Sequence, residues 1–319
     1  MSIIPWTEKY RPQKLDEVSY HDKIIKTLKK CMNGSIFTHL LFYGPPGTGK
    51  TSTILALAKE LYGLKNISSN MLELNTSDDR GIKTVRSQIK EFIATKSLDG
   101  GNFYKLVVLD EADEMTIDAQ IILKQIMEKY SYNAKFCLIG NNIENISPEL
   151  QSRCNKFRFS PLPSNIIKDY LKHILKLENI DHDDKGLDLL IKKTNGDMRQ
   201  SINSLQLISL TNNIITVDNV RRNLELIPDD DINLIYNMLI KKSENIYNCY
   251  LTIKKILNNE KVTLHSLIIE LQYKIANEDK TDLILKIFQI LGTYEINTIN
   301  NPNINVQLLG MISAFYKIE

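Results

Sequence analysis

The sequence predicts an α/β fold, in which a parallel sheet covered by helices on both faces is followed by two helical domains. Three observations support this prediction. Residues 44–51 match the phosphate-binding pattern G-x-x-x-x-G-K-[ST] and stand between an apolar run and a helical stretch. Short apolar runs alternate with amphipathic segments as far as residue 160. Beyond that point, apolar residues recur only at helical spacing.

The first 160 residues begin with a leader and then alternate strands and helices. The leader, residues 6–12, is aromatic and basic and has no helical or strand period, so it either packs over another element or forms a surface strap. In the first expected helix, Ile24, Ile25 and Leu28 share one face. Residues 104–109 are apolar throughout, as expected of a strand buried on both faces. The expected strands are residues 39–43, 71–74, 104–109, 136–140 and 156–159, the last at an edge. The expected helices are residues 21–32, 52–61, 82–94 and 118–130.

Prolines divide the rest of the chain. Pro161 and Pro163 end the first domain, and Pro228, with three aspartates after it, begins a new helix. An asparagine-rich segment, residues 297–305, is expected to be a loop. The expected helices are residues 164–179, 183–194, 197–211, 216–225, 231–242, 245–258, 263–277, 280–292 and 304–317. The expected domains are residues 1–160, 161–228 and 229–319.

Composition indicates a globular protein with a substantial core. Of the 319 residues 43% are hydrophobic, and no apolar run approaches the roughly 20 residues that cross a bilayer. The first residues do not resemble a secretory signal. Four scattered cysteines without a C-x-x-C pair fit reduced thiols in the cytosol or nucleus and disfavour a zinc site. The net charge of +2 is too small to indicate a nucleic-acid binder by itself.

The glycine-rich loop predicts a nucleotide site. A strand–loop–helix junction turns successive backbone N–H groups toward one anion, and the helix dipole adds to them. Lys50 is expected to reach the β and γ phosphates of ATP or GTP, and the Thr51 hydroxyl to ligate Mg²⁺. The alternative is a glycine turn that only connects strand to helix. The expected binding residues are Gly44, Pro45, Pro46, Gly47, Thr48, Gly49, Lys50, Thr51 and Ser52.

Polar residues at the ends of two later strands extend this prediction. Asp110 and Glu111 follow a buried strand, whose carboxyl end faces the ligand crevice of a parallel sheet. Asp110 is suited to organise Mg²⁺ and Glu111 to polarise the attacking water, although turns also collect such residues. Asn141 ends the next strand, where its amide is suited to hold the water or the γ-phosphate; the alternative is a turn-forming Asn-Asn.

Two arginines stand in conspicuous sequence contexts. Phosphoryl transfer needs positive charge beyond Mg²⁺, and a guanidinium supplies it from the same chain or from a neighbouring subunit. Arg153 and Arg199 are the candidates, and for each of them a plain salt bridge remains the alternative.

The N-terminal half resembles the AAA+ clamp loaders, and specifically the small subunits of eukaryotic replication factor C. The resemblance is close to residue 160, recognisable through Arg199 and only architectural beyond about residue 230. Phe157-Arg158-Phe159, with Pro161-Leu162 after it, is most similar to the branch numbered third in yeast and fifth in human. The matching stretches are Trp-Thr-Glu-Lys-Tyr-Arg-Pro at 6–12, Phe-Tyr-Gly-Pro-Pro-Gly-Thr-Gly-Lys-Thr at 42–51, Leu-Asn-Thr-Ser-Asp-Asp-Arg-Gly at 74–81, Asp-Glu-Ala-Asp at 110–113 and Gln-Ser-Arg-Cys at 151–154.

This resemblance implies a role for several residues. Asn141 matches the family's first sensor and Arg199 its second, on a small helical lid domain. Arg153 matches the finger that reaches into an adjacent subunit's ATP site. Tyr10, Arg11 and Pro12 match the leader near the nucleotide base. The C-terminal helices match the collar through which five subunits form a spiral.

A basic stripe is the candidate DNA contact. Its members are three, six and ten residues apart and so share one helical face, which suits a duplex phosphate backbone. The alternative is an ordinary solvated face; the resemblance favours primer–template DNA. The stripe is Arg80, Lys83, Arg86 and Lys90, and it follows Thr76 and Ser77.

The resemblance implies an ATPase subunit, with ATP and Mg²⁺ as cofactors, of a nuclear heteropentamer. With four other subunits it would open the sliding clamp PCNA, load it on primed DNA and act in replication and repair, without a membrane partner. One departure is Lys124-Gln125, where the family carries Arg-Arg, which puts intersubunit coupling through that helix in doubt. The alternatives are another AAA+ DNA-remodelling ATPase such as a branch-migration helicase, and a scaffold whose nucleotide is structural.

Overall fold

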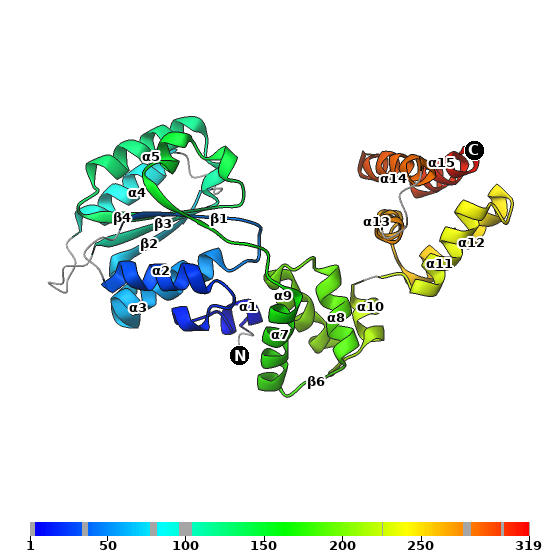
Figure 1. Cartoon of the computed structure of the whole chain (residues 1–319), viewed down its shortest axis with the longest axis horizontal. Helices are drawn as coiled ribbons and strands as arrows, with labels where there is room; N and C mark the ends of the chain where they lie inside the picture. Colours follow the sequence, from blue (N-terminus) through cyan, green and yellow to red (C-terminus); the bar gives the residue numbers. More distant parts are fainter. Residues whose placement is uncertain are drawn as a thin grey trace. The chain divides into compact units, whose positions relative to one another are not determined.

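The computed structural model describes residues 4–33, 38–76, 82–95, 104–224, 226–276, 282–300 and 303–318, without the side chains of residues 33 and 82–86. The chain divides into two compact units, Met1–Leu210 and Thr211–Glu319. Figure 1 traces both of them. The domain limits expected at residues 160 and 228 divide the chain differently and stay predictions.

A five-stranded parallel sheet forms the centre of the first unit (Figure 1). Its order is β2-β3-β4-β1-β5. Since all strand pairs are parallel, every carboxyl end lies at one edge of the sheet. This arrangement confirms the expected α/β fold. The strands are β1 (His39–Tyr43), β2 (Met71–Asn75), β3 (Lys105–Asp110), β4 (Ala134–Gly140) and β5 (Cys154–Arg158).

Helices cover both faces of the sheet, because alternate strand side chains point to opposite faces. In β1, Leu40 and Phe42 pack into one core cluster and Leu41 into the other, and all three are fully buried. Figure 1 shows α2 and α3 on one side of the sheet and α4 and α5 on the other. These helices are α2 (Asp22–Asn33), α3 (Lys50–Asn70), α4 (Ile82–Ala94) and α5 (Ile117–Lys129).

Helix α3 is longer than the helix expected at residues 52–61. It continues to Asn70 across Gly63, whose φ of 73° and ψ of 160° are not helical, so two helical segments meet there. Only glycine adopts these angles at little cost. The sequence pattern identified the first segment and missed the second.

The leader contains a short helix, α1 (Trp6–Lys9), which its sequence period did not indicate. Pro5 precedes this helix and its carbonyl accepts from the N–H groups of Glu8 and Lys9. Short helical turns and a two-residue strand complete the first unit: η1 (Leu15–Glu17), η2 (Ala112–Glu114), η3 (Ile143–Asn145), α6 (Pro148–Gln151) and β6 (Asp181–His182). Its last long helices are α7 (Ser164–Glu178), α8 (Asp184–Lys193) and α9 (Met198–Thr211).

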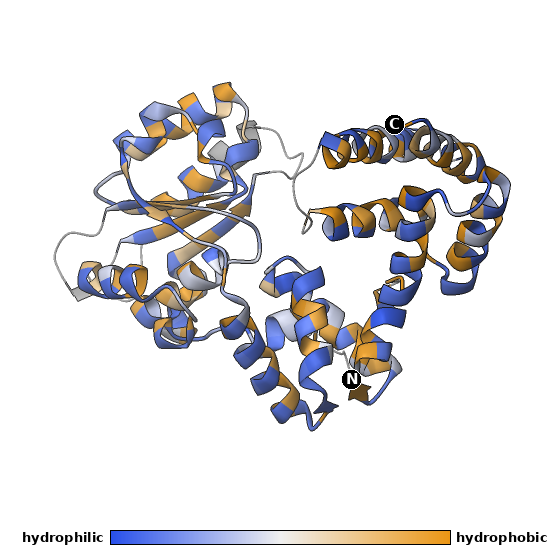
Figure 2. Ribbon diagram, turned by 45° about the vertical axis from the view of Figure 1, so that its right-hand side comes forward, coloured by the Kyte–Doolittle hydropathy of each residue, from blue (hydrophilic) through white to orange (hydrophobic). Residues whose placement is uncertain are grey.

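From Ile227 onward, the helices of the second unit pack around a core of their own. Ile235, Ile253, Leu267, Leu291 and Ile312 are fully buried in that core. Figure 2 shows the underlying pattern, in which helices carry orange, apolar stretches beside blue, polar ones. The elements are β7 (Ile214–Ile215), α10 (Val217–Asn223), α11 (Asp229–Lys241), α12 (Ile246–Glu260), α13 (Leu264–Ile275), α14 (Asp282–Asn300) and α15 (Ile304–Lys317).

Helix α14 corrects the loop expected at residues 297–305. The helix runs to Asn300, beyond the expected end at residue 292. Glu295 accepts a 2.8 Å hydrogen bond from Gln272 of α13, and Leu291 is fully buried. Packing against α13 therefore outweighs the low helix propensity of asparagine in the last turns.

Among the described residues, no helix combines the length and the hydrophobicity needed to cross a bilayer.

Candidate nucleotide site

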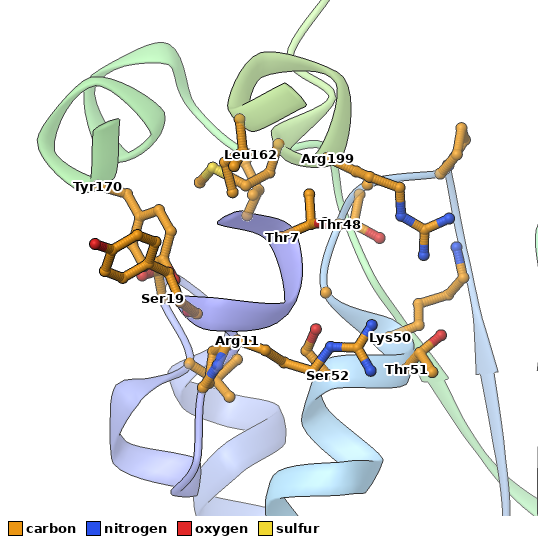
Figure 3. A pocket seen from close by; sticks show the side chains of 18 of the residues that line it. Thr7, Arg11, Ser19, Thr48, Lys50, Thr51, Ser52, Leu162, Tyr170 and Arg199 are labelled. Carbon is orange, nitrogen blue, oxygen red and sulfur yellow. The ribbon is translucent and has the colours of Figure 1, made fainter. Parts of the chain in front are cut away.

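A cavity of about 490 Å³ lies in the first unit at the carboxyl edge of the sheet (Figure 3). The leader, the glycine-rich loop and the ends of β3 and β4 line it together with α7 and α9. Of the expected nucleotide-binding residues, most line this cavity: Tyr10, Arg11, Pro12, Pro46, Gly47, Thr48, Gly49, Lys50, Thr51, Ser52, Asn141 and Arg199. Gly44 and Pro45 are not part of the lining, but their carbonyl oxygens accept hydrogen bonds from Lys50 Nζ.

The loop needs glycine at two positions for reasons of space as well as backbone angle. Gly44 has a φ of 144°, and a Cβ there would come within 2.1 Å of the Phe159 carbonyl oxygen. Gly47 has a φ of 69°, and its Cβ would come within 2.0 Å of Asp197 Oδ1. Both contacts lie far below van der Waals distance, so strand-end and helix-end groups pack directly on the loop backbone.

Lys50 is the central cation of the cavity and is 7% exposed. Its Nζ donates to the carbonyl oxygens of Gly44 (2.7 Å) and Pro45 (2.8 Å) and to Asn141 Oδ1 (3.0 Å). An ammonium has three donors, so all are used, and a bound phosphate must replace one acceptor. Burial lowers the pKa of Lys50 to about 8, against the raising effect of Asp110.

Arg199, on the first turn of α9, faces the same space as Lys50 (Figure 3). The pKa of Lys50 is lowered by its burial first, and the Arg199 charge lowers it further. Two cations that oppose each other in this way favour an anionic ligand between them.

Asp110 ends strand β3 at the cavity, and Glu111 follows it. Thr51 Oγ1 donates to Asp110 Oδ2 at 2.8 Å, so the two expected magnesium ligands are neighbours. Glu111 adopts the left-handed conformation, with a φ of 57°. Thr76 Oγ1 donates to the carbonyl oxygens of Asp110 (3.0 Å) and Glu111 (2.7 Å), which helps to hold that turn.

The donor set fits Mg²⁺. The Thr51 hydroxyl oxygen and the Asp110 carboxylate oxygen lie 2.8 Å apart, and both are hard oxygen ligands. Magnesium usually takes one or two such ligands from the protein, and waters and phosphate oxygens complete its coordination. Thr51 and Asp110 would hold the ion at the edge of the cavity.

The leader closes the other end of the cavity. Tyr10, Arg11 and Pro12 line it together with Tyr170 of α7. The Tyr170 hydroxyl donates to the Tyr10 carbonyl oxygen, and the Tyr10 hydroxyl donates to Glu178 Oε1 at 2.6 Å. The leader is thereby fastened to α7.

Glu178 also receives a hydrogen bond from Lys9 Nζ at 2.7 Å, on the same oxygen. Burial alone would raise the pKa of Glu178, but the hydrogen bonds from Lys9 and Tyr10 outweigh it and the pKa is lowered. The Glu178 hydrogen bond is also the largest cause that raises the pKa of Lys9. Glu178 therefore stays ionised and accepts from both leader residues.

Arg153 is not brought into this cavity. It follows α6 and forms an ion pair with Glu128 of α5, and both side chains are about 40% exposed. One helical turn away on both elements, Lys124 pairs with Glu149 at 2.5 Å, with the charges reversed. Lys124 of α5 thus forms a second link to the segment that carries Arg153.

Most side chains of the expected DNA stripe lie outside the described residues. Ser77 and Arg80 are outside the described residues, as are the side chains of Lys83 and Arg86. Lys90 is half-buried on α4. The Thr76 hydroxyl donates to the Asp110 carbonyl oxygen at the end of β3. The stripe stays a prediction.

Sequence reasoning missed several residues that shape the site. Thr7, Val18, Ser19, Leu162, Tyr170, Met198 and Ile202 also line the cavity. Thr7 and Leu162 stand in stretches that the sequence analysis quoted, but no role was assigned to them. The others come from separate elements without a common motif, so no local pattern identifies them. The Asp-Glu-Ala-Asp run did contain a signal for Asp113, whose Oδ2 accepts from the backbone N–H groups of Asn141 (3.0 Å) and Asn142 (2.9 Å).

His21 is a further missed residue, at the start of α2. Its Nε2 lies 3.1 Å from the Thr48 carbonyl oxygen, which requires the proton on that nitrogen. Burial lowers the pKa of His21, although this hydrogen bond raises it. His21 therefore supports the loop as a neutral donor.

Comparison with known proteins places this geometry in a family. Residues 40–162 match the ATPase family associated with various cellular activities (AAA). A rice protein named replication factor C subunit 3 is 40% identical over 98% of this chain and 86% of its own length. A human protein named replication factor C subunit 5 is 38% identical over 98% of this chain and 91% of its own length. An Arabidopsis protein with that name is 49% identical over 69% of this chain and 60% of its own length.

Solved structures support the fold alone. The Thermotoga maritima RuvB Holliday junction branch migration motor superposes with a TM-score of 0.54 and 16% identity, over 82% of this chain and 91% of the motor. At that identity the likeness carries no statement about activity.

Proposed function

We propose a function from one premise: this chain belongs to the family of replication factor C subunits. The proposal is that it binds and hydrolyses ATP as one subunit of a heteropentameric clamp loader. That assembly opens the sliding clamp PCNA and loads it onto primed template DNA during replication and repair, in the nucleus.

One observation carries the proposal. Lys50, Thr51, Asp110, Glu111 and Arg199 converge on one cavity, whereas Arg153 lies outside it on the surface. A phosphoryl-transfer site needs further positive charge opposite the leaving group. An exposed arginine suits a neighbour's site, so hydrolysis needs at least two subunits side by side.

The chain's own residues then divide the work. Lys50 exchanges one of its three acceptors for a phosphate oxygen, and Arg199 approaches the γ-phosphate from α9. Glu111 orients the attacking water and accepts its proton, while Asn141 holds the water's position. Thr51 and Asp110 would hold magnesium, which would neutralise phosphate charge when bound.

The remaining contacts follow from assembly. The basic stripe that ends at Lys90 follows the DNA backbone, and residues 229–319 provide the helical collar. ATP binding holds the spiral in the form that grips clamp and DNA, and hydrolysis releases them.

The test is ATP turnover by the full chain, alone and assembled with four partner subunits, with and without primed DNA and clamp. Wild type, Lys50→Ala and Arg153→Ala are compared. We expect low turnover alone, strong stimulation in the assembly, and a loss in both variants, with Lys50→Ala also losing nucleotide binding. Full activity of the isolated chain, indifferent to Arg153, would contradict the shared site.

A branch-migration motor remains the rival. The likeness to RuvB concerns the fold. A homohexamer in a native mass measurement would favour that rival, whereas a one-to-one stoichiometry with four other subunits supports the clamp loader.

A further inference from the structure

Asp113 has an unusual environment just behind the cavity. It lies in η2, directly after β3, and reaches across to the end of β4. One oxygen, Oδ2, accepts from two consecutive backbone N–H groups, those of Asn141 at 3.0 Å and Asn142 at 2.9 Å. The other oxygen, Oδ1, is buried, and the described part of the chain offers it no hydrogen-bond partner.

Gly140 fixes the position of this carboxylate. A Cβ on Gly140 would lie 2.8 Å from Asp113 Oδ1, 3.1 Å from its Cγ and 3.2 Å from its Cβ. The Asp113 side chain therefore lies directly against the backbone of Gly140, and a larger residue there displaces it. The φ angle of Gly140 is not in the left-handed region, so backbone conformation does not require glycine at the end of β4. The close approach of Asp113 does require it.

Asn141 depends on this support. Its side chain is exposed, and its Oδ1 accepts a 3.0 Å hydrogen bond from Lys50 Nζ. The backbone N–H of the same residue is held by Asp113. A continuous chain of contacts thus runs from Asp113 through Asn141 to Lys50.

We propose that Asp113 is a positioning residue: by accepting the N–H groups of Asn141 and Asn142 against Gly140, it sets where the Asn141 amide meets the γ-phosphate and the attacking water. Asp113 itself does not line the cavity. The kinetic part of this inference rests on the proposed function, whereas the structural part does not.

A purely structural role makes a different prediction. A carboxylate that only caps a turn contributes stability, and its loss lowers the melting temperature without a specific kinetic effect. A positioning residue acts through Asn141, so the two substitutions must not be additive. Misplacing a group by about 1 Å costs up to about 100-fold in rate.

The experiment is a double-mutant cycle in the assembled complex with DNA and clamp. Asp113→Ala, Asn141→Ala and the double variant are compared with wild type in kcat and in KM for ATP. We expect kcat to fall about tenfold or more in each single variant, no further fall in the double variant, and a KM within about threefold of wild type. Losses that multiply in the double variant, or wild-type kcat for Asp113→Ala, overturn the proposal.

Three further variants sharpen the cycle. Gly140→Ala should reproduce the kcat loss, because its Cβ displaces the carboxylate, and it replaces Asp113→Ala in the cycle if that variant does not fold. Asp113→Asn keeps one oxygen acceptor and should recover part of the lost kcat. Glu114→Gln is the matched control: Glu114 is the exposed neighbouring acid on η2, outside the cavity, and its variant should retain wild-type kcat.

Amide hydrogen exchange provides a readout without turnover. In the isolated full chain, Asp113→Ala should speed exchange at Asn141 and Asn142 by about tenfold or more, and Glu114→Gln should not. Unchanged exchange overturns the proposal. If the wild-type complex hydrolyses no ATP, the proposed function fails, and faster exchange in Asp113→Ala still supports the positioning contact.

Discussion

His39 begins strand β1, and its Nδ1 accepts a 3.2 Å hydrogen bond from the backbone N–H of Phe136. An accepting nitrogen carries no proton, so the fold requires neutral imidazole. Burial lowers the pKa of His39 to about 4, and the charges of Lys135 and Arg153 lower it further. The ordinary pKa of histidine is 6.5. At mildly acidic pH, His39 therefore binds a proton in the unfolded chain but not in the folded chain.

This difference predicts acid sensitivity. The contribution is complete above about pH 6.5 and is lost as pH falls through the window from 6.5 to about 4, by at most about 3 kcal/mol in the free energy of unfolding. Urea denaturation at several pH values measures it. His39→Gln has no ionisation, so its stability should fall less steeply across that window; parallel curves for the two proteins would refute the assignment.

Glu111 holds a left-handed backbone conformation that costs a non-glycine residue about 1 kcal/mol or more. Glu111→Gly and Glu111→Ala both remove the carboxylate, but only glycine relieves the backbone. We expect both variants to lose turnover in the assembled complex by at least about 100-fold. The glycine variant should be more stable to urea than the alanine variant by about 1 kcal/mol. Equal stabilities would show that the turn is not strained.

At the residue scale, the sequence predicted those parts of the cavity lining in which a single motif supplies several adjacent residues. The loop from Gly44 to Thr51 fixes its own geometry, so those residues were found together. Asp113 was not found as a functional residue, because its role depends on Gly140 lying beside it in space. Only the strand order, with β3 next to β4, makes that contact.

The leader is the element whose contacts carry a prediction of their own. Glu178 on α7 binds both Lys9 and Tyr10, and Tyr10 lines the cavity. Glu178→Gln should loosen the leader and raise the Kd for a fluorescent ATP analogue about threefold to tenfold, while the pair's exposure keeps the loss of stability under about 1 kcal/mol.

The matched control is another ion pair of α7. Asp188 of α8 pairs with Lys168 of α7 at 2.7 Å, and both residues lie outside the cavity lining. Asp188→Asn should therefore leave the Kd unchanged. If both variants weaken binding equally, the leader is not the cause.

Among the elements, the spacing of apolar residues and the positions of prolines and glycines predicted the ends of most helices and strands to within two or three residues. The exceptions are those decided by tertiary packing. Helix α14 continues through asparagines because it packs on α13, and the second segment of α3 resumes after a glycine. The short helix α1 forms where the leader meets Gln206 of α9, whose Oε1 accepts from Trp6 N at 3.0 Å.

The two units each have their own hydrophobic core, which predicts separate responses to ligand. At 100 times its Kd, ATP with magnesium should stabilise the first unit by about 2.7 kcal/mol. In calorimetry that corresponds to an increase of roughly 5–10 °C in one melting transition, without a shift in the transition of Thr211–Glu319. Lys50→Ala should show no increase, and an equal shift of both transitions would argue against independent units.

For the whole molecule, strand–helix alternation around the glycine-rich loop was sufficient to predict the parallel sheet. It did not predict the order β2-β3-β4-β1-β5, because crossovers of similar length connect different neighbours. The division at residue 210 likewise reflects contacts that keep α7, α8 and α9 with the sheet in the first unit, and no composition change marks it.

The leader also has a consequence for how the chain is made. Trp6 and Gln206 are 200 residues apart, and Tyr10 and Glu178 are 168 apart. At about 5–20 residues per second, a ribosome needs on the order of 10–40 s to supply the partner of Trp6. The leader thus leaves the ribosome well before its partners and docks late, and during that interval the nascent cavity lacks the wall that the leader provides.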